Sequence, residues 1–406
     1  MAKRSAKQLI PPAVLLGGEA IAVSLARCLA SAGIFVCALG EASVDPVRHS
    51  RSCGTFVHVG SGDGVQTRYF EWLAETRGPS RVVFPCNDDA LELIARRRDD
   101  LLELGCITIE ANDELVLAML DKERTYELAR QVGVAAPVTR PVRSWDDVQS
   151  AADEIGYPFA LKPHHSHLFA HRFGMQTKLL FIKDRQGLER AFDQLAPLDL
   201  EMMATEVVPG PVGQVSTYTA YLDEEGTPLV DFTRRKIRQY PPHFGRGSYY
   251  VMEPNPRVAE LGLHFFRAIG LHGLASVEFK PDARDGQLKL IECNYRFDGA
   301  IGLSRAAGLD LGRFTHERLL GGRPSVPPFR REGVRLLSLI DDCRSSFILW
   351  REGELGLVEW ARSLLHRQHF QVFSWRDPLP GVIGVTRVVG RMFRRNGQRA
   401  ANAVRA

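Results

Sequence analysis

Apolar and polar residues alternate on both sides of Asp285-Gly286, within the segment 276–296, and this pattern predicts two strands joined by a tight turn. Side chains two positions apart on a strand point to the same face. Glu278 therefore lies on one face of the first strand, and Glu292 and Asn294 share a face of the second. We expect these three oxygen-bearing side chains to converge.

The predicted hairpin carries the chemistry of a magnesium-dependent phosphoryl-transfer site. Carboxylate and amide oxygens are ligands that Mg²⁺ takes, usually together with substrate phosphates and water. Arg296, just beyond the second strand, can hold an anion or the charge of a phosphoryl group in transfer. The alternative interpretation is an ordinary hairpin whose acidic residues face water.

The N-terminal region has the pattern of an open α/β sheet. The apolar run 13–16 is followed by Gly17-Gly18, an amphipathic stretch and a second apolar run, which predicts a β-α-β unit. A third apolar run begins at Arg81 and again leads into a helical stretch, so residues 12–115 are expected to form a mainly parallel sheet. The turn lacks the third glycine of GxGxxG, which disfavours an NAD-dependent dehydrogenase.

Two further sections follow this region. Residues 116–330 have an α+β pattern, with a central lid subdomain at about 137–203 and one continuous helix expected over 112–132. Residues 331–406 form a small C-terminal section with a basic, apolar helix from Val382 to Arg395. That helix is expected either to dock on the protein or to contact an anionic membrane surface peripherally.

Composition narrows the class of protein. The chain has 406 residues, 45% of them hydrophobic and 25% charged, which is typical of two or three globular domains. The net charge of +4 gives no electrostatic case for nucleic acid binding. Seven scattered cysteines without a CxxC pair, and the lack of any apolar run near the ~18 residues that a membrane span needs, predict a cytoplasmic protein.

The run Leu290-Ile-Glu-Cys-Asn-Tyr-Arg296 resembles the Glu-x-Asn-x-Arg signature that ends the ATP-binding region of ATP-grasp enzymes. Glu278 stands where that family carries its other metal ligand. The resemblance implies an ATP-grasp fold behind an N-terminal Rossmann-like domain, with ATP and two Mg²⁺ ions, or Mn²⁺ in their place. Glu292 would bridge both ions and Asn294 would bind the second. Tyr295 replaces the family's usual proline.

The same resemblance extends to the ATP-binding residues. Lys122 and Lys162 follow the order in which the family uses its phosphate-binding lysines, and Lys178 is a further candidate. The segment Glu206-Val207-Val208, followed by Pro209-Gly210, resembles the hinge that contacts adenine, and Gln214 is the candidate ribose contact.

The loop after Lys162 departs from the family's glycine-rich flap. It carries four histidines within eight positions and only one glycine, Gly174; the histidines are His164, His165, His167 and His171. We expect a polar flap whose imidazoles touch phosphate or acceptor. A transition-metal site is the alternative, because imidazole is a common zinc ligand.

A basic run precedes the hairpin, and alternation places Arg234, Lys236 and Arg238 on one side of it. This run resembles the Lys-x-Arg-Gln-Tyr-Pro-Pro element of an ATP-grasp branch related to D-aspartate ligase and carbamoyl phosphate synthase. In that setting Lys236 and Arg238 would hold the γ-phosphate or a carboxylate substrate, and together with Arg296 they are the candidate catalytic residues.

The activity implied is that of an ATP-dependent carboxylate-amine ligase, which forms an acyl phosphate and then an amide, with release of ADP and phosphate. Its partners would be small-molecule carboxylate and amine substrates rather than nucleic acid. Two alternatives stay open: transfer to bicarbonate or carbamate, as in carbamoyl phosphate synthesis and carboxylation, and a non-catalytic nucleotide-binding module. Intact Glu278, Glu292 and Asn294 argue against the second.

Overall fold

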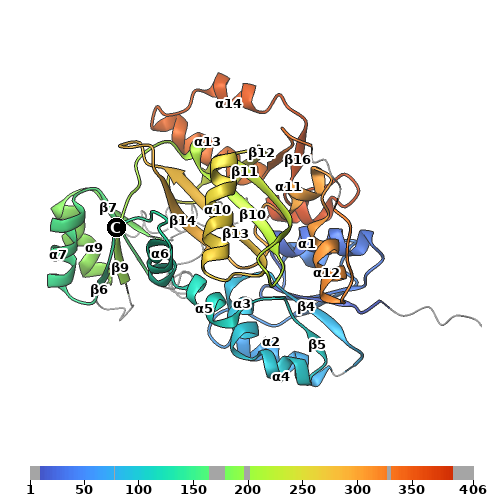
Figure 1. The fold of residues 1–406 in the computed structure, drawn as a ribbon. Coiled ribbons are helices and arrows are strands. Elements are labelled where there is room, and N and C mark those ends of the chain that lie inside the picture. Colours follow the sequence, from blue (N-terminus) through green and yellow to red (C-terminus); the bar gives the residue numbers. More distant parts are fainter. Residues whose placement is uncertain (1–9, 77, 164–178, 196–201, 327–330, 387–406) are drawn as a thin grey trace, which may run out of the picture. The chain divides into compact units, whose positions relative to one another are not determined.

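The computed structural model describes residues 10–76, 78–163, 179–195, 202–326 and 331–386 (Figure 1). The chain divides into two compact units, each made of residues that lie close together in space. Unit 1 contains residues up to Ile109, Asp310–Ser325 and the chain from Phe370; unit 2 contains Glu110–Leu309 and Val326–His369. Each unit combines separate stretches of the sequence. The three consecutive domains expected above remain a prediction. Within the described residues, every helix is too short or too polar to cross a bilayer. All seven cysteines are free thiols.

Unit 1 is built on a parallel sheet. Its described strands are β1 (Ala13–Leu16), β2 (Val36–Gly40), β3 (Thr55–His58), β4 (Arg81–Pro85) and β5 (Cys106–Ile107). They run in the order β3-β2-β1-β4-β5, and each neighbouring pair is parallel. Every residue of β1, β2 and β4 is buried, as expected for a parallel sheet covered on both faces. The open parallel sheet predicted from the sequence is therefore confirmed.

Helices surround this sheet: α1 (Ala20–Ser31), α2 (Val65–Glu75), α3 (Asp88–Arg96), α4 (Arg98–Glu103) and α12 (Leu311–Leu319), with the 3₁₀ helix η1 (Pro46–His49). The turn before α1 needs both of its glycines. Gly17 has φ +122°, and a Cβ on Gly18 would lie 2.3 Å from Oδ2 of Asp45. These contacts explain the Gly-Gly pair without a dinucleotide.

Unit 2 contains a sheet with seven described strands. They are β10 (Ser216–Leu222), β11 (Pro228–Tyr240), β12 (Arg246–Met252), β13 (Gly273–Pro281), β14 (Leu288–Asn294), β15 (Arg335–Leu337) and β16 (Gln368–Phe370). The order is β14-β13-β10-β11-β12-β15-β16. The β13–β14 hairpin predicted around Asp285-Gly286 is present, with Gly286 at φ +74°.

Helices pack on both faces of this sheet. On one face, Tyr218 of β10 lies against Phe266 of α10 (Pro256–Ala268), and α13 (Leu339–Arg351) packs on β11 and β12. On the other face, α11 (Ile301–Ala306) packs its Leu303 with Tyr250 and Met252 of β12. The short helices η3 (Val212–Gln214) and α14 (Leu357–Ser363) complete this part of the unit. The face that carries α11 also carries the predicted ligands, as the register below shows.

Unit 2 contains a second, antiparallel sheet, which we call the lid after the lid subdomain predicted at about 137–203. Its described strands are β6 (Thr139–Val142), β7 (Phe159–Pro163), β8 (Leu180–Ile182) and β9 (Met202–Glu206), in the order β6-β9-β7-β8. Helices α7 (Trp145–Ile155) and α9 (Arg185–Leu195) supply Val148, Ala151 and Leu188 to a core shared with one face of the sheet. Ser144 caps α7 through a complete capping box with Asp147.

The single helix predicted over 112–132 was wrong. The segment forms two helices, α5 (Asp113–Leu120) and α6 (Lys122–Gln131), separated at Asp121. Asp121 has an extended backbone, with ψ 118°, and its carboxylate accepts hydrogen bonds from the backbone N–H groups of Glu123 and Arg124. An aspartate that caps a new helix competes with continuation of the old one. Lys122 consequently stands at the first position of α6.

The expectation that Arg238 shares a face with Lys236 was also wrong. Strand β11 continues through the whole basic run, but its register with β12 shifts between Lys236 and Arg238. Lys236 pairs with Tyr250, whereas Arg238 pairs with Tyr249, and neighbouring residues of one strand point to opposite faces. One extra residue in a strand thus turns Arg238 away from the predicted ligands.

Arg238 instead forms a buried ion pair with Asp342 of α13. Its Nε and Nη2 atoms lie 2.8 and 2.9 Å from the two carboxylate oxygens. The side chains of Ser248 and Trp360 donate to the same carboxylate at 3.2 and 3.1 Å. The carboxylate is thus fully hydrogen-bonded, and it attaches α13 to the sheet.

We predict that Asp342→Ala lowers the free energy of unfolding by about 3 to 5 kcal/mol, because it leaves the buried Arg238 guanidinium without a counter-charge. Asp341→Ala is the matched control, since Asp341 is the neighbouring, partly exposed acid in the first turn of the same helix. It should cost about 1 kcal/mol or less. Urea unfolding measures both, and equal midpoints for the two variants would contradict the role given to this ion pair.

Candidate active site

The two predicted carboxylate ligands lie directly opposite each other. Glu278 of β13 pairs with Glu292 of β14, and the next pair on that face is Ser276 with Asn294. Residues paired across neighbouring strands share a face, so all three predicted ligands project from the same side of the sheet. Two carboxylates in directly opposed positions repel each other. The site is therefore one of concentrated negative charge that requires cations.

Two lysines from other elements supply that charge. Lys236 of β11 donates to Oε2 of Glu278 across 2.7 Å, and both side chains are about nine-tenths buried. Lys122, at the start of α6, lies 3.4 Å from Oε1 of Glu292. Each carboxylate thus meets a cation already. Carboxylate and amide oxygens beside cationic groups form a donor set that fits Mg²⁺.

A buried arginine network borders the carboxylates on the same face. Arg234 forms an ion pair with Asp298, which also accepts from Ser276 Oγ at 3.0 Å. Burial acts to raise the pKa of Asp298, but the charge of Arg234 and the hydrogen bonds that the carboxylate accepts together outweigh it, and the pKa lies below its usual range. Thr217 pairs in register with both Glu278 and Arg234, and its buried Oγ1 has no hydrogen-bond partner among the described residues. Asp298 and Thr217 were not identified from the sequence. Their positions beside Arg234 and Glu278 depend on how strands far apart in the sequence pair.

Lys162 reaches the hairpin through a tyrosine. Its Nζ donates to the hydroxyl of Tyr126 in α6 across 3.0 Å, and that hydroxyl donates to the carbonyl of Ile291 in β14 across 2.8 Å. The ammonium also lies 4.9 Å from the centroid of the tyrosine ring. Tyr126 was not singled out from the sequence.

Burial controls the charge of Lys162. The side chain is only 8% exposed, and burial together with the nearby charge of Lys122 lowers its pKa to about 7, against a smaller opposing effect of Glu292. Burial also raises the pKa of Tyr126, so its hydroxyl stays protonated and able to donate. Lys162 therefore changes between its charged and neutral forms near neutral pH, and an anionic ligand would favour its charged form.

The predicted hinge follows strand β9. Glu206 forms an ion pair with Lys289 of β14 at 2.9 Å and another with Arg284. Burial acts to raise the pKa of Glu206, but these hydrogen bonds outweigh it, and the pKa is lowered. The carbonyl of Val208 accepts from Nζ of Lys280 at 2.8 Å, which leaves the hinge in contact with β13. Val207 lies in the same irregular segment, and Gln214 is exposed at the end of η3.

The remaining candidates have mixed outcomes. Arg296 is half-buried and donates to the carbonyl of Phe297 at 3.0 Å, just after the hairpin. Arg238 is not brought to the carboxylates. The predictions for Lys178, the four flap histidines and the arginines at 387–395 lie outside the described residues. The structure thus brings together Lys122, Lys236, Glu278, Glu292 and Asn294.

Comparisons with known proteins agree with this geometry. Residues 220–340 match the family described as ATP-grasp in the biosynthetic pathway with Ter operon. The chain is 25% identical over 335 residues to a D-aspartate ligase from Enterococcus faecium (strain Aus0004), covering 79% of each chain. It is 26% identical over 230 residues to a D-alanine–D-alanine ligase from Ectopseudomonas mendocina (strain ymp), covering 52% of this chain and 68% of the relative.

Solved structures share the fold. An N5-carboxyaminoimidazole ribonucleotide synthetase in complex with ADP aligns with a TM-score of 0.61 at 13% identity, covering 81% of this chain and 82% of the other. The biotin carboxylase domain of the Hydrogenobacter thermophilus 2-oxoglutarate carboxylase, with MgADP and bicarbonate, gives 0.62 at 17% identity, covering 81% and 74%. The chain has the ATP-grasp fold, and it is similar in sequence to ATP-grasp ligases.

The ATP-grasp fold accounts for the architecture of both units. The parallel sheet of unit 1 corresponds to the N-terminal domain that precedes the ATP-grasp fold, and the two sheets of unit 2 belong to that fold. Solved structures with this fold contain MgADP or ATP. The metal and nucleotide roles of individual residues in this chain are proposals, developed below.

The low pKa of Lys162 makes a prediction about stability. Burying the protonated Lys162 costs stability, and this penalty is complete below pH 7, where the folded and unfolded chains both hold the proton. The penalty declines between pH 7 and 10.5, where the folded chain has released the proton and the unfolded chain still binds it. Lys162→Met removes it. We expect the stability gain of the variant over wild type to be about 2 to 3 kcal/mol larger at pH 6 than at pH 9.

Urea unfolding of both proteins at pH 6 and pH 9 measures this difference. Lys183→Met is the control, since Lys183 is an exposed lysine of the same unit. A gain independent of pH for Lys162→Met would show that the lysine keeps its ordinary affinity for protons in the folded protein.

Proposed function

We propose that this ATP-grasp protein is an ADP-forming carboxylate-amine ligase. One observation carries the proposal: Glu278 and Glu292 lie opposite each other on the sheet, and each is met by a lysine from a different element. A purely structural hairpin gains nothing from two opposed carboxylates. A site that binds a nucleoside triphosphate with metal ions needs negative charge to hold the ions and positive charge to hold the phosphates. The D-aspartate ligase relative, which aligns over 79% of each chain, supports an amine as the acceptor.

The proposed ligand roles follow from donor chemistry. Glu278, Glu292 and Asn294 would hold Mg²⁺, which supplies charge neutralisation at the phosphates when it is bound. Lys236 and Lys122 would turn from the carboxylates to phosphate oxygens as the ions take their place. Lys162 would bind phosphate from the lid, and its charge would be restored by the anion. The segment Glu206–Val208 would contact adenine.

The reaction proceeds in two balanced steps. A carboxylate oxygen of the substrate attacks the γ-phosphorus, the bond to the β-γ bridging oxygen breaks, and ADP leaves. The amine then attacks the acyl carbon, loses a proton, and expels phosphate together with the oxygen that came from the carboxylate. The first step needs no protein nucleophile, because phosphoryl transfer depends on positioning and charge. Arg296, just after the hairpin, would position the carboxylate.

We expect Glu292→Gln to reduce ADP formation by at least about 100-fold, because the amide keeps the shape of the side chain but not its charge. The exposed Glu260 of α10 gives the matched control, Glu260→Gln, which should keep wild-type turnover. A coupled assay for ADP measures both variants. Turnover of Glu292→Gln within tenfold of wild type would contradict the metal role of this residue.

The oxygen path distinguishes this activity from its alternatives. An ADP-release screen of carboxylates against amines, with D-aspartate as the first carboxylate, identifies a substrate pair. The same reaction with ¹⁸O in the carboxylate should then give one heavy oxygen in phosphate for each amide formed, as mass spectrometry can count. Unlabelled phosphate, or AMP with pyrophosphate, would contradict an acyl phosphate. ADP release that needs bicarbonate instead of an amine would indicate carboxylase-type chemistry.

A further inference from the structure

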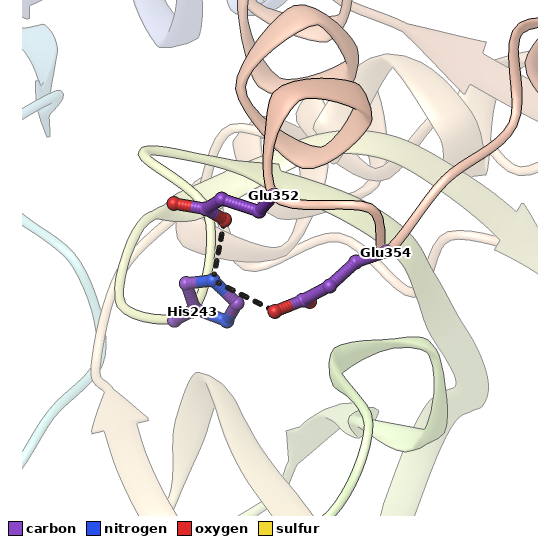
Figure 2. A group of neighbouring side chains, drawn as sticks. All are labelled: His243, Glu352 and Glu354. Carbon is purple, nitrogen blue, oxygen red and sulfur yellow. Dashed lines mark hydrogen bonds and ion pairs between the residues drawn. The ribbon is translucent and has the colours of Figure 1, made fainter.

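A histidine and two glutamates, all three exposed, meet at the surface of unit 2. Figure 2 shows the imidazole of His243 between the carboxylates of Glu352 and Glu354. Nε2 of His243 lies 3.2 Å from Oε2 of Glu352 and 3.8 Å from Oε1 of Glu354. From this geometry we propose that the three side chains form a binding site for a divalent transition-metal ion of the zinc type.

The spacing of the three donor atoms suits such an ion. Four tetrahedral ligands about 2.0 to 2.1 Å from zinc stand about 3.3 Å apart. The distances from Nε2 of His243 to the two carboxylate oxygens, 3.2 and 3.8 Å, are close to that separation. All three ligand atoms lie within 4.8 Å of one another. A mixed set of imidazole and carboxylates favours zinc over Mg²⁺, which prefers oxygen ligands alone. Water would fill the fourth position.

The two carboxylates are held there by the end of a helix. Gly353, at φ +77°, ends α13 in a Schellman motif. The N–H of Glu354 donates to the carbonyl of Leu349 at 2.8 Å, and the N–H of Gly353 donates to that of Trp350 at 3.1 Å. The left-handed glycine turns the chain between the glutamates, so their side chains flank one point. Their arrangement follows from the backbone.

The electrostatics of this helix end favour a cation. A helix C-terminus carries a partial negative charge, and carboxylates placed there are destabilising. Two glutamates follow α13, whereas its last turn contains one basic residue, Arg351. A single imidazole proton can satisfy only part of that negative charge. A divalent ion at Nε2 would neutralise both carboxylates and the helix end together.

His243 also occupies an unusual backbone position. Its φ of +70° lies in the left-handed region, and the N–H of Phe244 donates to the carbonyl of Pro242 at 2.9 Å. A hydrogen bond between residues i and i+2 around a positive φ is the classic γ-turn, which is strained for a residue other than glycine. The turn presents the imidazole to Glu352 and Glu354.

The site adjoins the lid. Phe244, next to His243, packs its ring against Phe181 of β8 with centroids 5.2 Å apart. On the other side, Ser345 of α13 donates to the carbonyl of Gln239 at 2.6 Å, so the β11–β12 turn is already joined to this helix. An ion at His243 would add a second connection between α13 and the turn that contacts the lid.

The test compares Zn²⁺ binding by the full-length chain with binding by two variants, whose substitutions lie in two separate segments of the chain. His243→Asn removes the imidazole and keeps a residue that tolerates positive φ. Glu354→Gln removes one carboxylate without changing shape. The control is His366→Asn, since His366 is an exposed histidine of the same unit. Chelator-treated proteins are titrated with Zn²⁺ by calorimetry at pH 7.5, with excess Mg²⁺ to occupy oxygen-only sites.

We expect wild type and His366→Asn to bind one equivalent of Zn²⁺ that His243→Asn lacks. Glu354→Gln should bind that equivalent about tenfold or more weakly, at least the loss that follows removal of an outer-sphere partner. Zn²⁺ bound by other histidines would contribute to the titrations of all four proteins, so it does not affect the difference between wild type and a variant. Circular dichroism confirms that the variants are folded. Equal stoichiometry and affinity in wild type, His243→Asn and Glu354→Gln would overturn the proposal and leave a surface ion pair.

Discussion

The repulsion between Glu278 and Glu292 is the constraint on which the centre of unit 2 depends. The two carboxylates are fixed opposite each other by the register of one hairpin, so the rest of the unit must deliver positive charge to that face. Strand β11 delivers Lys236, and the first turn of α6 delivers Lys122. The break between α5 and α6 serves this purpose, because it puts Lys122 at a helix start beside β14. A charge arrangement that would weaken a structural sheet therefore becomes the proposed ligand set.

The lid is connected to the same hairpin by polar contacts. Tyr126 bridges Lys162 of the lid to the backbone of β14, and Glu206 forms an ion pair with Lys289 of β14. Each contact includes a residue, Lys162 or Glu206, that is proposed to bind the nucleotide. Burial brings the pKa of Lys162 to about 7, so the strength of its attraction for an anion depends on pH near neutrality.

The opposite face of the sheet has a purely structural use of similar residue types. Arg238 and Asp342 form an ion pair as well buried as Lys236 and Glu278, but they attach α13 to the sheet. The two pairs arise from positions 236 and 238 of one strand. The irregularity between them decides which cation is available to a substrate and which one is consumed by packing.

The sequence by itself determined the hairpin, the shared face of its three oxygen-bearing residues and the resemblance to ATP-grasp enzymes, because these depend on a two-residue period, a turn and a short motif that are local. The parallel sheet of unit 1 and the capped helix α7 were predictable for the same reason. Only the tertiary structure decided the face of Arg238, since one inserted residue reverses every later side chain of a strand. The partners of Lys122, Lys162 and Asp298 also required the fold, because each contact joins segments that are far apart in the chain.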